Sequence, residues 1–210
     1  DILIFSAHGH PREYENILKN KKIKYIDATC PYVRKNLELI KNNKEVIYIG
    51  KKDHPEVIAS LSMNKDIHFY DTLNNNFNFK DVKTPSPCVI NQTTISLTEL
   101  EKIHCDIKKH IPNAIFVDGI CEVSKMRQQA IKKVDKNVDV VLVIGSKISS
   151  NTKELFNIAK QIYTDKQVLL IQDIDELKKQ TLSGNHFALA SGAATPISQV
   201  EEIKKYLENL

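Results

Sequence analysis

Residues 140–163 read VVLVIGSKISSNTKELFNIAKQIY. The unbroken apolar run Val140–Ile144 is typical of a strand that is covered on both faces, and Asn151–Tyr163 has the apolar spacing of an amphipathic helix. A short polar loop joins the two segments. Because a strand followed by a loop and a helix is the repeating unit of parallel α/β folds, this stretch predicts that fold class.

The same alternation extends along almost the whole chain. Most of the predicted strands are nearly continuous apolar runs, and they are Ile2–Phe5, Lys24–Ile26, Val46–Ile49, Ile67–Tyr70, Cys88–Ile90, Ala114–Val117, Val140–Ile144, Val168–Ile171 and Phe187–Ala190. The clearest helical patterns are Leu97–Lys109, Val123–Val134, Asn151–Tyr163 and Ile197–Leu207. Nine strands do not fit a complete eightfold barrel, so we expect several small parallel sheets with flanking helices.

Composition excludes several classes of protein. The 210 residues are 41% hydrophobic and 27% charged, which is enough apolar material for a sizeable core. No apolar run approaches the roughly 18 residues of a membrane helix, so no membrane span is predicted. Among 30 basic residues only Arg12, Arg34 and Arg127 are arginines, and the lysines are scattered along the predicted helices. A nucleic-acid partner is therefore not expected, because nucleic-acid readers more often gather Arg in a basic patch.

Polar residues gather just after the predicted strands. These clusters are Ser6–Gly9, Asp27–Cys30, Asp53–Glu56, Asn91–Thr94, Asp118–Cys121, Ser149–Asn151 and Ser191–Thr195. Parallel α/β folds bind ligands outside the carboxyl ends of their strands. The clusters are therefore candidates for one shared site.

Two of these clusters repeat a pattern. Asp27-x-x-Cys30 and Asp118-x-x-Cys121 each follow an apolar strand and open a helix, and the two cysteines lie 91 residues apart. Either cysteine could be a buried packing residue, but a helix N-terminus favours the thiolate that metals bind. Cys88, at the start of a strand, and Cys105, in the middle of a helix, are predicted to be packing residues. With no secretory signal and a sizeable core, a disulfide framework is not expected.

Cys30 and Cys121 do not complete a metal site by themselves. Zinc needs four ligands, and His8 and His54 could supply the other two. An iron–sulfur cluster instead needs three or four cysteines. The same 91-residue spacing upstream of Cys30 reaches about 60 residues before Asp1, and the chain begins in an apolar run without a methionine. We therefore expect an N-terminally truncated chain whose third cysteine lies upstream of Asp1.

Three other clusters have both a structural and a functional interpretation. Glu56 follows His54-Pro55 at the start of a helix, where it is either a favourable first-turn carboxylate or a proton donor beside a histidine. One residue of the run 149–151 should cap the following helix. The three polar side chains together, at a helix N-terminus, would also suit a diphosphate. His8 lies in a loop beside Gly9, where backbone can approach a ligand closely. Gly145-Ser146-Lys147 lacks the spacing of a P-loop, so ATP hydrolysis is not predicted.

Taken together, seven strings resemble the 4-hydroxy-3-methylbut-2-enyl diphosphate reductase family, which completes the methylerythritol phosphate route to isoprenoids. They are SAHG at 6–9, DATCPYVRK at 27–35, GKKDHPEV at 50–57, NQTTIS at 91–96, GICEVSKMRQ at 119–128, IGSKISSNT at 144–152 and SGAATP at 191–196. Their order is that of the family, and they cover essentially the whole chain.

The resemblance implies three pseudo-symmetric α/β lobes, each supplying one cysteine to a 4Fe–4S cluster that has one open iron. Cys30 and Cys121 match two of those ligands. On this pattern residues 1–30 are the remnant of an incomplete first lobe, 31–120 are the second lobe and 121–194 are the third. Residues 195–210 are expected to form a C-terminal helix that returns toward the first lobe.

The implied activity is reductive removal of the hydroxyl group of 4-hydroxy-3-methylbut-2-enyl diphosphate, with two electrons and two protons, to give isopentenyl or dimethylallyl diphosphate and water. Glu56 matches the proton-delivering glutamate, His54 the histidine that assists it, and Thr93 the threonine near the substrate hydroxyl. The positions that match diphosphate-binding residues are His8, Ser149, Ser150 and Asn151.

The implied partners are this allylic diphosphate and an electron donor such as ferredoxin or flavodoxin, in a bacterial cytoplasm or a plastid-like organelle. The chain departs from the family pattern at Ala194, where serine is usual, and at His10, where an apolar residue is usual. Two alternatives stay open at this point: a non-catalytic zinc- or phosphate-binding module, and an inactive fragment of the reductase.

Overall fold

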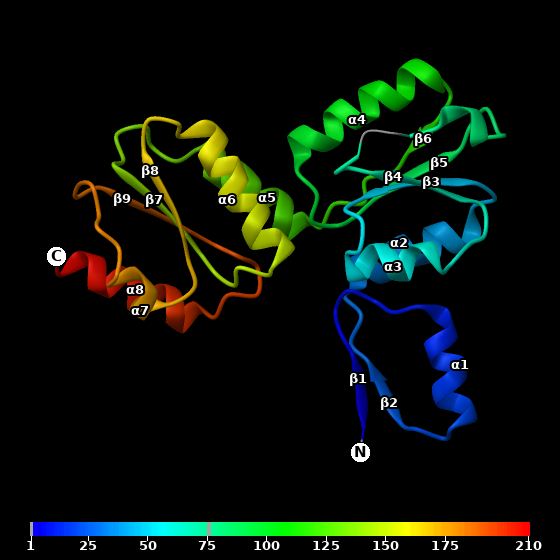
Figure 1. Ribbon diagram of the computed structural model, residues 1–210, viewed down its shortest axis with the longest axis horizontal. Helices are drawn as coiled ribbons and strands as arrows, with labels where there is room; N and C mark the ends of the chain where they lie inside the picture. Colours follow the sequence, from blue (N-terminus) through cyan, green and yellow to red (C-terminus); the bar gives the residue numbers. More distant parts are fainter. Residues whose placement is uncertain (1, 75–76) are drawn as a thin grey trace. The chain divides into compact units, whose positions relative to one another are not determined.

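The computed structural model describes residues 2–74 and 77–210 (Figure 1). The nine predicted strands are all present, as β1 (Leu3–Phe5), β2 (Tyr25–Asp27), β3 (Val46–Gly50), β4 (Ile67–Asp71), β5 (Cys88–Asn91), β6 (Ile115–Phe116), β7 (Val140–Ile144), β8 (Gln167–Ile171) and β9 (Phe187–Ser191). The helices are α1 (Arg12–Asn20), α2 (Pro31–Asn42), α3 (Pro55–Leu61), α4 (Leu97–His110), α5 (Glu122–Lys132), α6 (Ser150–Ile162), α7 (Ile174–Leu177) and α8 (Ile197–Glu208), with a 3-10 turn at Phe79–Asp81.

The strands form three small parallel sheets flanked by helices, which confirms the predicted fold class at this level. The first sheet pairs β1 with β2, the second has the order β4-β3-β5-β6, and the third has the order β8-β7-β9. The chain divides into two compact units, Asp1–Ile120 with the first and second sheets and Cys121–Leu210 with the third. The lobe boundaries expected from the sequence stay a prediction.

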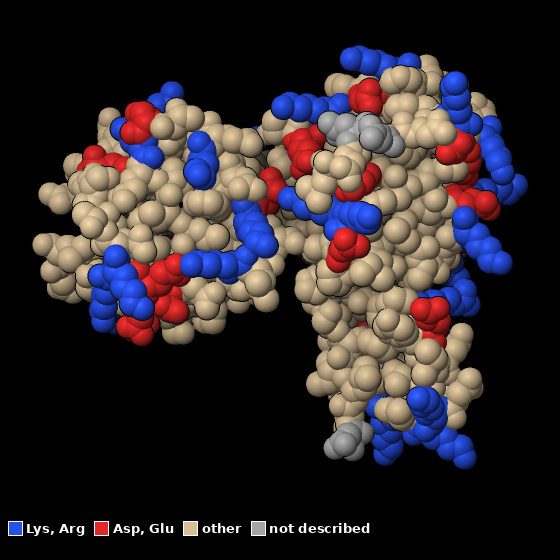
Figure 2. All heavy atoms as spheres, in the orientation of Figure 1, with Lys and Arg blue, Asp and Glu red and all other residues tan. Residues whose placement is uncertain are grey.

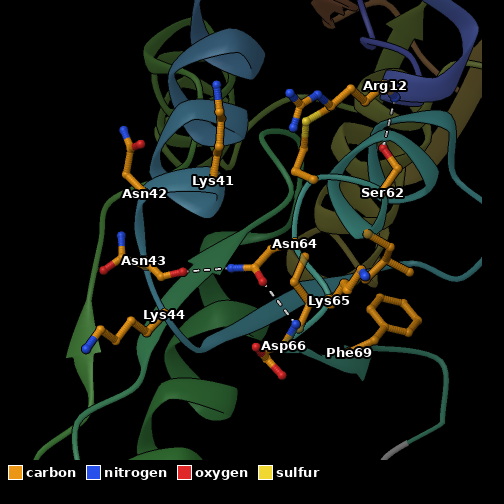
Figure 3. Close-up of a pocket in the computed structure, with 13 residues that line it drawn as sticks. Arg12, Lys41, Asn42, Asn43, Lys44, Ser62, Asn64, Lys65, Asp66 and Phe69 are labelled. Atoms are coloured by element: carbon orange, nitrogen blue, oxygen red, sulfur yellow. Dashed lines mark hydrogen bonds between the residues drawn. The ribbon is translucent and has the colours of Figure 1, made fainter. Parts of the chain in front are cut away.

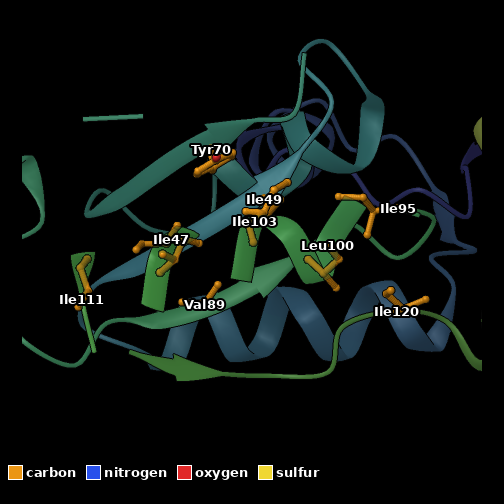
Figure 4. Close-up of a cluster of buried hydrophobic side chains, with 10 residues drawn as sticks. Ile47, Ile49, Tyr70, Val89, Ile95, Leu100, Ile103, Ile111 and Ile120 are labelled. Atoms are coloured by element: carbon orange, nitrogen blue, oxygen red, sulfur yellow. The ribbon is translucent and has the colours of Figure 1, made fainter. Parts of the chain in front are cut away.

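The second sheet is buried on both faces, as its continuous apolar strands require. Successive side chains of β3 point to opposite faces. Ile47 and Ile49 pack under α4, together with Ile103 and Ile107 of that helix (Figure 4). On the other face, Val46 and Tyr48 pack with Ile40 of α2 and Val57 of α3, the pair of helices that Figure 1 shows beneath the sheet. The sheet therefore holds α3, which carries Glu56, in a fixed position.

The third sheet has the same layered construction. Val141 and Val143 of β7 face α5 and α6, while Val140 and Leu142 face α7 and α8. Ile203 and Leu207 of α8 lie in that second core. The C-terminal helix α8 therefore packs on the third sheet through its buried apolar stripe; its predicted return toward the first lobe stays a prediction.

The first sheet is the least buried of the three. Phe5 and Leu18 are covered, but the side chains of Ile4 and Ile26 are 65% and 52% exposed. His10, for which the sequence suggested no role, is buried here: its ring stacks on Phe5 at 3.5 Å and its Nε2 lies 3.3 Å from Glu15 Oε1. His10 therefore serves the packing of this small sheet.

On the face drawn in Figure 2, Lys and Arg side chains are interspersed with Asp and Glu. The helices of the described ranges include none whose length and apolar content would let it cross a bilayer.

The amino-terminal ends of β3 and β4 border an open hollow of about 1170 Å³ (Figure 3). Its rim carries Arg12, Lys41, Lys44 and Lys65, all on the surface. The polar clusters that were singled out from the sequence lie at the opposite, carboxyl-terminal ends of the strands, so this hollow is not part of the candidate site.

Candidate active site

Glu56 is the centre of the candidate site in the unit Asp1–Ile120. It is the second residue of α3 and only 1% exposed, because the helix packs on the second sheet. Its Oε1 accepts hydrogen bonds from the Thr93 backbone N–H at 2.8 Å and from the Tyr48 hydroxyl at 3.3 Å. The Thr93 hydroxyl lies 2.7 Å from Oε2. The middle of β3 and the loop after β5 thus both supply hydrogen bonds to one buried carboxyl group.

Burial raises the pKa of Glu56 to about 7, although the bonds from Thr93 and Tyr48 act in the opposite direction. Removing a carboxylate from water disfavours its charged form, and hydrogen bonds to that form favour it. At neutral pH the protonated and ionised forms are therefore both populated. A carboxyl group in this state is suited to general acid–base catalysis.

His54 is the N-cap of α3. Its Nδ1 accepts the Glu56 backbone N–H at 3.2 Å, so the ring proton of the neutral tautomer is on Nε2. Burial, with smaller contributions from His8 and Lys51, lowers the pKa of His54 to about 4. The imidazole is consequently neutral at physiological pH, and its Nε2–H stays available as a hydrogen-bond donor.

His8 reaches the same site from the loop after β1. Its ring meets that of His54 edge to face, with the ring centres 5.5 Å apart, and its Nδ1 lies 3.3 Å from the Ser6 hydroxyl. The next residue, Gly9, has φ +80°, and a Cβ there would lie 3.2 Å from Leu37. The tight turn at Gly9 therefore holds an exposed His8 against His54.

The loop after β5 is fixed to the loop after β3. Gln92 is 1% exposed, and its Oε1 accepts the Lys51 backbone N–H at 3.0 Å while its Nε2 donates to Thr94. This cross-link positions Thr93 over Glu56. Gln92 belongs to a strand-end cluster but is not among the site residues predicted from the sequence, and neither is Tyr48, which lies inside an apolar strand. A hydroxyl in an otherwise aliphatic strand needs a buried partner, which is the signal that could have found Tyr48.

The second group of predicted residues lies at the start of α6, in the unit Cys121–Leu210. Ser149 caps the helix by accepting the Thr152 backbone N–H at 3.4 Å, and Ser150 is half-buried in its first turn. Asn151 is 8% exposed, and its Oδ1 accepts a bond from the Ser124 hydroxyl at 3.1 Å. Its Nδ2 has no hydrogen-bond partner among the described residues. An unsatisfied buried N–H donor at a helix N-terminus is suited to an anionic oxygen.

A cavity of about 320 Å³ opens beside this helix start, lined in part by Ser149, Ala194 and Thr195. Gly145 has φ +145°, and a Cβ there would lie 2.6 Å from Thr195 Oγ1, so only glycine fits this close approach. Arg127 of α5 holds the carboxyl end of β9 by donating from its guanidinium to the Ser191 carbonyl at 2.7 Å and to the Ser191 hydroxyl at 2.9 Å. Ala194, where the family pattern usually has serine, lines this cavity and offers it no hydroxyl group.

Cys30 and Cys121 occupy equivalent local positions. Each is a partly exposed free thiol and the N-cap of a helix, α2 and α5 respectively, with no hydrogen bond from its side chain to the helix backbone. Across residues 2–74 and 77–210, no three His, Cys, Asp or Glu side chains are gathered as a metal site. The two cysteines belong to different units, so each is described by itself.

The other two cysteines differ. Cys88 is buried in β5, where burial raises its thiol pKa, and this confirms its packing role. The packing role predicted for Cys105 is wrong, because its side chain is exposed. Ile103 and Ile107 mark the buried face of α4, and a residue two positions from either lies on the opposite side of the helix.

Comparisons with known proteins agree on one family. Residues 1–208 match the family model described as LytB protein. A 4-hydroxy-3-methylbut-2-enyl diphosphate reductase of Wigglesworthia glossinidia brevipalpis is 36% identical over 219 residues, covering 99% of this chain and 69% of the relative. The enzyme of the same name from Bacillus cereus (strain AH187) is 34% identical over 211 residues, covering 98% of this chain and 66% of the relative.

Two solved structures are also similar. The E-1-hydroxy-2-methyl-but-2-enyl-4-diphosphate reductase of Plasmodium falciparum has a TM-score of 0.86 at 29% identity, covering 98% of this chain and 66% of that one. A structure of (E)-4-hydroxy-3-methyl-but-2-enyl diphosphate reductase has a TM-score of 0.66 at 29% identity, covering 100% and 76%. The chain thus spans about two thirds of the length of several of these relatives. By sequence along nearly its whole length, and by fold, it belongs to the LytB family.

Proposed function

We propose that this chain carries the acid–base and diphosphate-binding residues of a reductase that converts 4-hydroxy-3-methylbut-2-enyl diphosphate into isopentenyl and dimethylallyl diphosphate. The observation that carries the proposal is Glu56, a buried carboxyl group with three hydrogen bonds and a pKa raised to about 7. Membership of the LytB family supports the choice of substrate. Replacing the allylic hydroxyl by hydrogen consumes two electrons and two protons and releases water.

In this proposal Glu56 supplies a proton to the departing hydroxyl group. Near pH 7 it can be protonated before the reaction and can give up the proton without a large penalty, because its pKa is close to the working pH. The Thr93 hydroxyl, 2.7 Å from Oε2, can accept this proton while it donates its own, and so connects the carboxyl group to the substrate oxygen.

His54 and His8 bind and orient the substrate in the proposed reaction. His54 is neutral, and its Nε2–H is free of the helix-capping role that occupies Nδ1, so it can donate to a substrate oxygen without competing as an acid. His8 is exposed beside it and can reach a phosphate oxygen. This arrangement separates binding from proton transfer, which remains with Glu56.

The diphosphate is proposed to bind Ser149, Ser150 and Asn151 as well as His8. The Asn151 Nδ2–H is buried without a partner in the part of the chain that the structure describes, so a phosphate oxygen would satisfy it. The first turn of α6 adds backbone N–H groups and the positive end of the helix dipole. Binding energy from the diphosphate, remote from the reacting carbon, would position the hydroxyl group for reaction.

Cys30 and Cys121 are proposed to supply two thiolates to a 4Fe–4S cluster. Their donor chemistry fits: both are free, partly exposed thiols at helix N-termini, whereas Cys88 is buried and Cys105 lies in the middle of a helix. When bound, such a cluster would supply electrons and a Lewis-acidic iron for carbon–oxygen cleavage. The electrons would come from a donor such as ferredoxin or flavodoxin, in a bacterial cytoplasm or a plastid-like organelle.

The test is anaerobic reconstitution of the protein, in its complete reading frame, with iron and sulfide, followed by the hydroxylated diphosphate and dithionite. We expect brown absorption and formation of isopentenyl or dimethylallyl diphosphate, measured by mass spectrometry. Cys30→Ser and Cys121→Ser should each lose the brown absorption, whereas Cys105→Ser is the matched control and should keep it. A protein that holds the cluster but forms neither product would contradict the proposal.

A further inference from the structure

Tyr48 places a polar group in the middle of an apolar layer. It is the third residue of β3, is 0% exposed, and packs among Val46, Val57 and Ile90. A phenol hydroxyl without an acceptor in such a layer would cost free energy, so its partner is informative. The Tyr48 hydroxyl donates to Glu56 Oε1, at 3.3 Å, and the Ser60 hydroxyl also acts on the phenol.

The two oxygens of Glu56 have different surroundings. Oε1 faces the Thr93 backbone N–H and the Tyr48 hydroxyl, and a backbone N–H can only donate. Oε2 faces the Thr93 hydroxyl, which can either donate or accept. A proton on Oε2 therefore finds an acceptor in Thr93. A proton on Oε1 would compete with the Thr93 backbone N–H and would require the Tyr48 hydroxyl to turn from donor to acceptor.

We propose that Tyr48 is a positioning residue that holds Oε1 as the carbonyl oxygen of protonated Glu56 and thereby keeps the transferable proton on Oε2, against Thr93 Oγ1. This inference rests on the proposed function of Glu56 for its catalytic meaning, but the location of the proton depends only on the geometry. The Thr93 backbone N–H alone would leave one lone pair of Oε1 without a donor, and the Tyr48 hydroxyl supplies that donor.

The surrounding charges support this arrangement. Burial raises the pKa of Tyr48 well above its usual value, and the neighbouring Glu56 acts in the same direction, so the phenol keeps its proton and remains a donor. The side chains that act on the Glu56 carboxyl are Thr93, from the loop after β5, and Tyr48, from β3. His54, at the start of α3, bonds to the Glu56 backbone and is neutral near pH 7.

The experiment compares wild type with Tyr48→Phe, without substrate or cluster, by infrared spectroscopy of the protonated carboxyl group. The Glu56 band is identified as the one that Glu56→Gln removes. Because Tyr48→Phe takes a hydrogen bond from the carbonyl oxygen, we expect the C=O stretch of Glu56 to move to higher frequency. In a ¹³C NMR titration, the same variant should raise the Glu56 pKa by about half a pH unit to one unit, since a donor to the carboxylate is lost.

Tyr70→Phe is the matched control. Tyr70 is also buried and its hydroxyl also bonds to a carboxyl group, that of Asp106 at 3.3 Å, but it lies in the core on the opposite face of the sheet. It should leave the Glu56 band and titration unchanged. Circular dichroism and thermal melting check that both variants fold.

A folded Tyr48→Phe protein with an unmoved Glu56 band would overturn the inference, because the carbonyl oxygen would then be Oε2. If Tyr48→Phe unfolds, Thr93→Val gives the second readout. This variant removes the hydroxyl partner of Oε2 and keeps the backbone N–H that donates to Oε1, so the C=O stretch should stay close to its wild-type frequency. A clear shift of the stretch to higher frequency in Thr93→Val would contradict the assignment. Neither readout requires reductase activity, so failure of the proposed function is detected separately.

Discussion

The polar clusters after β3 and β5 and the cluster after β7 come from similar strand–loop–helix units, but their hydrogen bonds differ. Around Glu56, both carboxyl oxygens accept bonds from the protein, at 2.7 to 3.3 Å. At the start of α6, Asn151 bonds to Ser124 through Oδ1, yet its buried Nδ2 has no partner within the described ranges. Burial favours the protonated form of Glu56 and the three hydrogen bonds fix the position of its carboxyl group, whereas the unpaired Asn151 N–H is suited to a ligand oxygen as its partner.

The largest expected effect tests the first half of this comparison. Glu56→Gln keeps the size of the side chain and removes the transferable proton, so we expect turnover of the reconstituted enzyme to fall by about 10²–10⁴-fold. Substrate affinity should change little, since the diphosphate is proposed to bind elsewhere. Single-turnover kinetics with the hydroxylated diphosphate measure both. Turnover within about twofold of wild type would remove Glu56 from the proton-transfer role.

The next effect is on stability. The folded-state pKa of Glu56, about 7, lies above its ordinary value of 4.5, so the folded state holds more protons than the unfolded state between these values. Stability from this group is therefore present below about pH 4.5 and is lost as the pH rises through 7. At 1.36 kcal/mol per pH unit the full loss of stability is at most about 3.5 kcal/mol.

The contribution of His54 to stability changes with pH in the opposite direction. Its pKa falls from 6.5 to about 4 on folding, so it costs stability as the pH falls below 6.5. In wild type the contributions of Glu56 and His54 to the free energy of unfolding change in opposite directions between pH 4.5 and 6.5. Glu56→Gln removes the contribution of Glu56 and leaves that of His54. The free energy of unfolding of the variant, relative to wild type, should therefore increase as the pH is raised from 5 to 8. Urea titrations at several pH values measure this, and parallel pH curves for the two proteins would contradict the raised pKa.

The open donor of Asn151 predicts an effect on binding. Asn151→Ala removes a hydrogen bond that is made to a charged ligand oxygen, so we expect the KM for the diphosphate substrate to rise by about 10- to 100-fold. The pH profile of turnover should keep its shape, because Glu56 is untouched. Ser124→Ala serves as the control, since it removes only the partner of Oδ1 and should change KM less. An unchanged KM in a folded Asn151→Ala protein would show that Nδ2 does not meet the ligand.

The fold could be predicted from the sequence because its strands are covered on both faces. Val140–Ile144 was predicted and found with the same bounds, since a five-residue apolar run between polar loops is too short for a buried helix and long enough for a buried strand. The short α1 and α7 were not predicted, and Cys105 was assigned to packing although the spacing of Ile103 and Ile107 places it on the other face of α4. Periodicity around that cysteine would have corrected the assignment.

The candidate site was predictable as a set of strand-end clusters but not as a network. Glu56 is a candidate from its position at a helix start and Thr93 from the family resemblance, yet the contact between them joins residues 37 apart and depends on how β3 and β5 pair. For the same reason, the sequence does not point to Tyr48 and suggests no role for His10. Their partners, Glu56 and Phe5, are determined by side-chain direction on a strand and in a turn, which residue types alone do not specify.

The smallest effect separates capping from ligand binding at Ser149. This hydroxyl accepts the Thr152 N–H at 3.4 Å, and Ser96 caps α4 in the same way, accepting the Glu99 N–H at 3.4 Å. Replacing either by Ala should cost about 1 kcal/mol of stability, measured by thermal or urea unfolding. Only Ser149→Ala should also weaken diphosphate binding, because Ser96 lies outside the proposed anion site. Ser149→Asp sharpens the contrast: a carboxylate can still cap the helix, so stability should be kept, but its charge should repel the diphosphate. If Ser149→Asp binds the substrate as wild type does, Ser149 is a cap alone and the anion site reduces to Asn151 and its neighbours.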